Sequence, residues 1–212
     1  MNIDYRILAI IIGYCIGLVQ SAYIVGKLVR NIDIREHGSG NAGAANTLKT
    51  LGFRAGVTVL ISDAAKAVLA FTVCAAIWNG GGTFMGEGSV LPGLYGAFGA
   101  ILGHCFPFYL KFKGGKGFAS TLGLMISVNI WILLITVGIG IIIVLITRYT
   151  SFFTLETTFA MPIGFFFFGY PMEAIIIAVL VAALIWYLHR ANISRLLRRE
   201  ENRFEFKNLI GK

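Results

Sequence analysis

Long apolar runs separated by short polar segments extend along the whole chain. A transmembrane helix needs roughly 20 consecutive apolar residues, and fewer where neighbouring helices shelter it. By this measure we predict seven spans, at about residues 5–29, 53–78, 91–110, 117–130, 131–147, 155–169 and 172–190. The pattern therefore predicts an all-α integral membrane protein, a seven-transmembrane-helix bundle that forms a single membrane domain over residues 1–212.

The positions of the basic residues determine how many times the chain crosses. The stretch from Phe118 to Ile146 is long enough for one very long helix or for two short ones. Lysine and arginine gather after the first and third spans, at Arg148 and in the tail at about 191–212, whereas residues 79–90 and 170–172 contain neither. Because basic segments favour the cytoplasmic side, two crossings must lie between Lys116 and Arg148. We therefore expect the N-terminus outside and the C-terminus in the cytoplasm.

The composition excludes a soluble domain. Hydrophobic residues make up 57% of the 212 residues and charged residues 13%, against about 45–50% and about 25% in soluble domains. The 18 Lys and Arg outnumber the 10 Asp and Glu, so a net charge of +8 must sit in a few non-membrane segments. The three cysteines stand far apart, and we interpret them as small buried side chains rather than disulfide or metal ligands.

The first polar segment of unusual composition runs from Gly38 to Lys49. Small residues let backbone N–H groups approach a ligand closely, and a glycine-rich loop that enters a helix suits an anion. Asparagine and serine add uncharged donors, and the alternative is a small-residue turn that only packs helices tightly. The candidate binding residues are Ser39, Gly40, Asn41, Gly43, Asn46 and Lys49.

The second segment joins the end of the third span to a lysine-rich and glycine-rich stretch. It contains His104, Gly114, Gly115 and Lys116, and a lysine between glycines also suits a phosphate. Leu110 stands where a Walker loop needs its first glycine, so a nucleotide is not implied. The alternative interpretation is that these lysines only mark the cytoplasmic end of a helix.

The third segment lies where the last span leaves the membrane. His189, Asn192 and Arg195 follow one another at intervals of three, so they are expected on one face of a helix. A basic helix that attracts anionic lipid is the alternative. All three histidines lie in or beside the three segments, but no pair has zinc-site spacing, so no metal or other cofactor is expected.

One charged pair is expected inside the membrane. Asp63 and Lys66 lie one turn apart within the second predicted span. Ionisable groups in this position are costly unless they pair or face the protein interior. The pair therefore has either a purely structural role or a role in supporting the site.

Together the three segments resemble one family, the bacterial membrane acyl-phosphate:glycerol-3-phosphate acyltransferases of the PlsY type. The matching stretches are GSGNAGAANTLKTLG from Gly38, GHCFPFYLKFKGGKGFAS from Gly103 and HRANISRLL from His189. The resemblance implies transfer of a fatty acyl group from acyl phosphate to the 1-hydroxyl of glycerol 3-phosphate, which yields lysophosphatidate and phosphate in the first step of phospholipid synthesis. It also implies a multi-pass protein of the bacterial inner membrane with a cytoplasm-facing site, coupling to an enzyme that supplies acyl phosphate, and no nucleic-acid partner.

The resemblance also implies roles for individual residues. Lysines neutralise phosphate charge and loop donors bind it, while His189 and Asn192 orient the glycerol, with either His189 or a substrate phosphate as the base. The implied catalytic residues are His189, Asn192, Lys116 and Ser39. The implied substrate-binding residues are Gly40, Asn41, Gly43, Asn46, Lys49, His104, Gly114, Gly115, Thr154 and Arg195.

The chain departs from the family pattern at several positions. Ala42, Ala45 and Lys49 replace the usual Pro, Thr and Arg, Thr154 replaces a serine, and Arg199-Glu200-Glu201 replaces Gly-Thr-Glu. The main rival interpretation is a membrane transporter of an organic phosphate, which would use the same basic pocket. A non-catalytic lipid-binding scaffold is a second rival, but it would not need glycine and asparagine in these loops.

Overall fold

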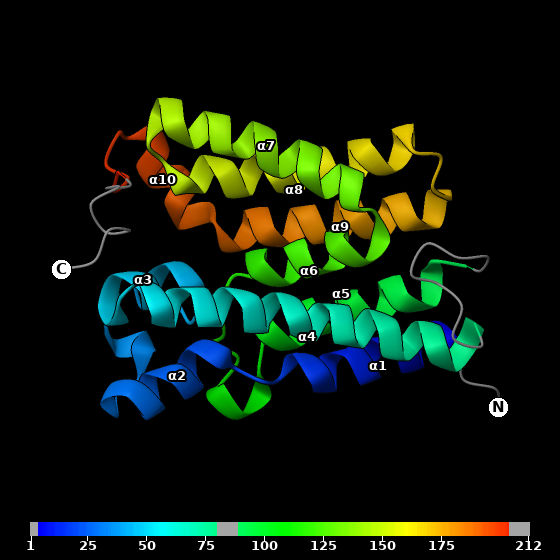
Figure 1. Ribbon diagram of the computed structural model, residues 1–212, viewed down its shortest axis with the longest axis horizontal. Helices are drawn as coiled ribbons and strands as arrows, with labels where there is room; N and C mark the ends of the chain where they lie inside the picture. The colour runs from blue at the N-terminus through cyan, green and yellow to red at the C-terminus, as the bar shows by residue number, and fades with distance from the viewer. Residues whose placement is uncertain (1–3, 80–88, 204–212) are drawn as a thin grey trace. The chain divides into compact units, whose positions relative to one another are not determined.

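The computed structural model describes residues 4–79 and 89–203, and this part of the chain is helical without β-strands (Figure 1). It divides into two compact units, one ending at Val128 and one beginning at Asn129. The first unit contains α1 (Tyr5–Gly17), α2 (Ser21–Arg30), η1 (Ile34–Glu36), α3 (Ala44–Leu51), α4 (Phe53–Asn79), α5 (Leu91–Cys105), η2 (Phe108–Leu110) and α6 (Phe118–Val128). The second contains α7 (Ile130–Thr147), α8 (Thr150–Phe167), α9 (Met172–Leu188) and α10 (Arg190–Leu197).

Close packing of α1, α4 and α5 forms the interior of the first unit (Figure 1). A Cβ atom added to Gly13 of α1 would collide with the carbonyl oxygen of Gly96 of α5. One added to Gly99 would collide with the carbonyl oxygen of Ile10. Small residues bring these backbones together, as is typical of helices that pack within a membrane.

The first predicted span is a broken helix. The apolar stretch Tyr5–Arg30 is long enough to cross a membrane, but α1 ends at Gly17 and α2 begins at Ser21. Gln20 lies in the break, is 1% exposed and donates to the carbonyl oxygens of Gly103 and His104 at 3.3 and 3.1 Å. Hydropathy does not reveal this break because only one polar residue marks it.

The structure confirms that the long apolar stretch from Phe118 to Ile146 is divided into two helices. α6 ends at Val128 and α7 begins at Ile130. The side-chain oxygen of Asn129 accepts hydrogen bonds from the backbone N–H groups of Trp131 and Ile132 at 2.9 and 3.3 Å. This asparagine is an N-cap, which supplies the physical reason for the new helix.

Helices α7, α8 and α9 form the body of the second unit, where α8 packs against both of the others (Figure 1). The last span and the tail helix α10 meet at an angle of 62°. Among the described residues, three helical segments pass a length and hydropathy test for a span: Tyr5–Arg30, Phe53–Trp78 and Ile130–Thr147. A fourth passes if α9 and α10 count as one bent span, so the seven-span count stays a prediction.

Candidate active site

Asn46 organises the first glycine-rich segment. Its side chain is 2% exposed, its Oδ1 accepts from the N–H of Ser39 at 2.8 Å, and its Nδ2 donates to the carbonyl oxygens of Ile34 and His37 at 2.9 Å each. Gly38 and Gly40 have φ values of 60° and 73°, which favour glycine. The amide of Asn46 therefore builds the loop, while Ser39 and Gly40 are exposed at its surface.

The second segment lies directly against the first. A Cβ atom on Gly115 would collide with Nε2 of His104 and would lie 2.6 Å from the carbonyl oxygen of Ala42. The N–H groups of Gly114 and Gly115 donate to the carbonyl oxygens of Cys105 and His104 at 3.2 and 3.1 Å. The structure thus brings together two segments that the sequence identified separately.

A cavity of about 540 Å³ opens between these segments. Arg35 crosses it, with a two-point ion pair to Asp33 (Nη2 to Oδ2 at 2.6 Å) and a hydrogen bond to the carbonyl oxygen of Leu110 at 3.3 Å. Hydrogen bonds from Arg35 hold the pKa of Asp33 below its ordinary value. The lining is basic on balance and includes two predicted residues: Asp33, Arg35, Glu36, Gly40, Tyr109, Leu110, Lys111, Lys113 and Gly114.

His104 is buried and is not among the residues that line the cavity. The side chain is 2% exposed, and its Nδ1 is 2.7 Å from Nζ of Lys66. Lys66 also pairs with Asp63, with Nζ to Oδ1 at 2.9 Å. Asp63 and Lys66 pair with each other inside the protein, as a structural role requires. The pair also contacts a predicted site residue, as a role in supporting the site requires.

The third segment is bent at its first residue. His189 ends α9 and precedes α10, so the expected single helical face from His189 to Arg195 is wrong at that position. Its Nδ1 lies 2.8 Å from the carbonyl oxygen of Ile185. A carbonyl only accepts, so Nδ1 carries the proton and the neutral ring has its lone pair on Nε2.

Asn192 and Arg195 meet at Glu201, a residue that the sequence analysis did not select. Asn192 Nδ2 donates to Glu201 Oε1 at 2.7 Å and to Ser151 Oγ at 3.1 Å. The Ser151 hydroxyl donates to the same Oε1 at 2.6 Å. Arg195 Nε donates to the other carboxylate oxygen, Oε2, at 2.6 Å. Burial raises the pKa of the Glu201 carboxyl, but these hydrogen bonds outweigh burial and place its pKa below the ordinary value. Ser151 and Glu201 stand where the family's motifs have serine and glutamate, and this match was the signal from which the sequence could have identified them.

Acid is expected to weaken this cluster. Because the folded-state pKa of Glu201 is lowered, its contribution to stability is present above the unfolded pKa of about 4.3 and is lost as pH falls through the folded value. Glu201→Gln should lower the free energy of unfolding by about 1–2 kcal/mol at neutral pH and by progressively less below about pH 4. Thermal unfolding in detergent measures this, with the exposed Glu200→Gln as the control; an equal loss at all pH values would contradict it.

The turn before Glu201 is strained at Arg199. This residue has φ 60°, where the family pattern has glycine. A non-glycine residue in the left-handed region costs about 1–2 kcal/mol, so Arg199→Gly should stabilise the protein by up to about 1 kcal/mol. The matched control is Arg198→Gly, since Arg198 has φ −84° and gains nothing from glycine. A lower unfolding temperature for Arg199→Gly than for the parent would rule out this strain.

The remaining predicted residues occupy simpler positions. Lys49 is exposed on α3, and Lys116 is half-buried between Gly115 and Gly117. Thr154 is buried on α8, where its carbonyl accepts from the Thr158 hydroxyl at 2.8 Å. Four of the fourteen predicted residues belong to the second unit: Thr154, His189, Asn192 and Arg195.

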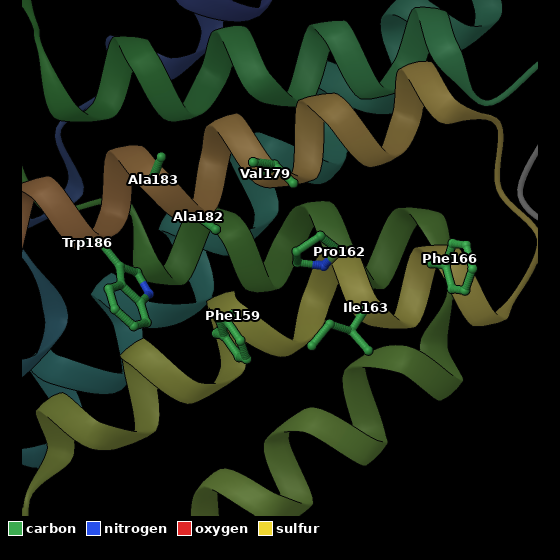
Figure 2. A pocket seen from close by; sticks show the side chains of 8 residues that line it. All are labelled: Phe159, Pro162, Ile163, Phe166, Val179, Ala182, Ala183 and Trp186. Carbon is green, nitrogen blue, oxygen red and sulfur yellow. The ribbon is translucent and has the colours of Figure 1, made fainter.

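An apolar groove of about 530 Å³ lies between α8 and α9 (Figure 2). Pro162 interrupts the helical hydrogen bonding of α8 beside it, and Trp186 closes one end, with Nε1 donating to the carbonyl oxygen of Leu155 at 3.2 Å. Several lining side chains are largely exposed, as expected for a surface that contacts lipid chains. The lining residues are Phe159, Pro162, Ile163, Phe166, Val179, Ala182, Ala183 and Trp186.

Helices with apolar exposed faces and a compact basic loop site define a membrane protein that handles a small anionic ligand. Residues 7–199 match the family model described as glycerol-3-phosphate acyltransferase. The chain is 38% identical over 206 residues to a glycerol-3-phosphate acyltransferase of Shouchella clausii, covering 95% of this chain and 97% of the relative. A Bordetella avium protein of the same name is 38% identical over 208 residues, covering 96% and 95%. The chain belongs to the glycerol-3-phosphate acyltransferase family.

Solved structures agree with this assignment. A crystal structure of PlsY (YgiH), described as an integral membrane glycerol 3-phosphate acyltransferase in its glycerol 3-phosphate form, matches with a TM-score of 0.86 and 30% identity over 99% of this chain and all of that one. The lysophosphatidic acid form matches with a TM-score of 0.83 at the same identity and coverage. The family is one of enzymes, which favours the acyltransferase interpretation over the transporter and the scaffold.

Proposed function

We propose that this protein transfers a fatty acyl group from acyl phosphate to the 1-hydroxyl of glycerol 3-phosphate. The glycerol oxygen forms a bond to the acyl carbonyl carbon, the bond from that carbon to the phosphate oxygen breaks, and the hydroxyl proton leaves to a base. The products are lysophosphatidate and inorganic phosphate. The observation that carries this proposal is the meeting of the Gly38–Asn46 loop and the Gly114–Lys116 loop at one basic cavity in a member of this family.

The first unit supplies the phosphate-binding groups in this proposal. Lys116 and Lys49 neutralise phosphate charge, and Ser39, Asn41 and loop N–H groups donate hydrogen bonds. Gly40, Gly43, Gly114 and Gly115 allow backbone to approach the substrate. Asn46 and His104 serve by holding the two loops in place, since both side chains are buried.

The groups that act on glycerol in this proposal are those that the resemblance to the family implies. His189, with its lone pair on Nε2, accepts the proton of the attacking hydroxyl, and a substrate phosphate is the competing acceptor. Asn192 and Arg195, fixed by Glu201, orient the substrate, and Thr154 contributes a hydroxyl from α8. Acyl phosphate is already activated, so positioning and charge stabilisation account for most of the catalysis.

The proposal includes the topology and the cell context. The chain forms a single domain of seven spans in the bacterial inner membrane, with its N-terminus outside and its catalytic residues facing the cytoplasm. An enzyme that makes acyl phosphate supplies the donor. No cofactor is part of the proposal.

The donor is tested directly with purified protein in detergent. Supplied with acyl phosphate and glycerol 3-phosphate, the protein should release phosphate and form lysophosphatidate in equal amounts. With acyl-CoA in place of acyl phosphate, no lysophosphatidate should form. Product formation from acyl-CoA alone would overturn the donor assignment, and no product from either donor would overturn the proposed activity.

A further inference from the structure

The buried ion pair of α4 contacts His104 of the candidate site. Asp63 and Lys66 are 1% and 6% exposed, and neither lines the cavity. Ionisable groups inside a membrane helix bundle are costly and mark a function by default. We propose that Asp63 and Lys66 are positioning residues for His104 and, through it, for the loop that carries Lys116; this inference rests on the proposed function of that loop.

The contacts of Lys66 fix the proton of His104. Nζ of Lys66 lies 2.9 Å from Asp63 Oδ1, 2.8 Å from the carbonyl oxygen of Val19 and 2.7 Å from His104 Nδ1. An ammonium paired with a carboxylate has only N–H donors and no acceptor, so Lys66 can only donate to the imidazole nitrogen. Nδ1 of His104 must therefore be the acceptor, and the proton of the neutral ring sits on Nε2.

The opposite edge of the same ring supports the loop. Nε2 of His104 lies so close to Gly115 that a Cβ atom there would collide with it. The carbonyl oxygen of His104 also accepts from the N–H of Gly115 at 3.1 Å. Rotation of the imidazole would therefore displace Gly115 and the next residue, Lys116.

The break in the first span supplies the carbonyl oxygen that accepts from Lys66. Val19 lies between α1 and α2, whereas a carbonyl inside an unbroken helix accepts from the residue four positions later. In the same break, Gln20 donates to the carbonyl oxygens of Gly103 and His104. Ser120, near the start of α6, donates from its hydroxyl to the carbonyl oxygen of Asp63 at 3.0 Å. The break between α1 and α2 and the helices α5 and α6 thus contact the pair on α4, which fits a positioning role.

The test removes both charges together. Loss of one partner alone would leave an unpaired buried charge, whereas the double variant Asp63→Leu/Lys66→Met replaces the pair with apolar side chains of similar size and should fold. A displacement of about 1 Å at a catalytic group costs about 10²-fold, so we expect kcat/KM for glycerol 3-phosphate to fall by roughly 10- to 100-fold. The control is Ser127→Ala, a buried hydroxyl on α6 that donates to Gly123 of its own helix.

Nitrogen-15 NMR of histidine-labelled protein supplies a readout that a merely structural role would not move. The His104 resonances, assigned with His37→Gln and His189→Gln, should show the proton on Nε2 in the parent and a mixture of tautomers in the double variant. A folded double variant with parental kcat/KM, or with an unchanged tautomer, would overturn the proposal. A proton on Nδ1 in the parent would overturn it without any variant. A parent protein that fails to transfer an acyl group would instead disprove the proposed function. The His104 tautomer would still test the contact between Lys66 and His104.

Discussion

Replacement of Lys116 by methionine is expected to lower kcat by about 10²- to 10³-fold. In the proposed reaction, negative charge accumulates on the acyl oxygen and on the departing phosphate as the glycerol oxygen attacks. Lys116 lies between two glycines. Gly115 packs against His104 and Ala42, and Gly117 has φ 84° and precedes α6. An ammonium on a loop fixed at both sides stabilises this charge with little reorganisation, and methionine keeps the length but not the charge.

Phosphate release in the presence of both substrates measures this loss. The control is Lys27→Met, since Lys27 is an exposed lysine in the last turn of α2 and is not among the residues that line the cavity. Lys116→Arg should recover part of the rate because it restores charge but not shape. Parental kcat in Lys116→Met would show that phosphate charge is neutralised by other groups, with Arg35 the first candidate.

The helices were predictable because hydropathy reports long apolar runs. The division near residue 129 followed from charge parity, and the structure adds the cap by Asn129 that enforces it. The break at residues 18–20 was not predictable, since it depends on carbonyl groups of α5 far along the chain that accept from Gln20. The bend at His189 was missed for a related reason: residues spaced three apart indicate a face only while the helix is continuous.

The candidate site could be proposed from the sequence where motifs carry glycine, lysine and asparagine, and less readily where its members are held by partners distant in sequence. The two loops were identified separately, but their meeting depends on the absence of a side chain at Gly115 beside His104. Glu201 was not predicted as a site residue because two adjacent glutamates in a charged tail are usually solvated. The hydrogen bonds from Ser151, Asn192 and Arg195 single out one of them, and the charge pattern of the tail does not distinguish the two, although the family's Gly-Thr-Glu motif does.

Replacement of His189 by glutamine is expected to lower kcat by about 10²- to 10⁴-fold, the usual contribution of a general base. The Nδ1 hydrogen bond to Ile185 leaves the lone pair of the neutral ring on Nε2, and glutamine has no comparable basic nitrogen. The rate of the parent should fall at acid pH as the imidazole is protonated, and this limb of the pH–rate profile should disappear in the variant. His37→Gln is the matched control, because His37 is exposed and its structural contact to Asn46 is made by its backbone carbonyl. Near-normal turnover with an unchanged profile in His189→Gln would assign the proton to a substrate phosphate, and the histidine would then serve to orient glycerol.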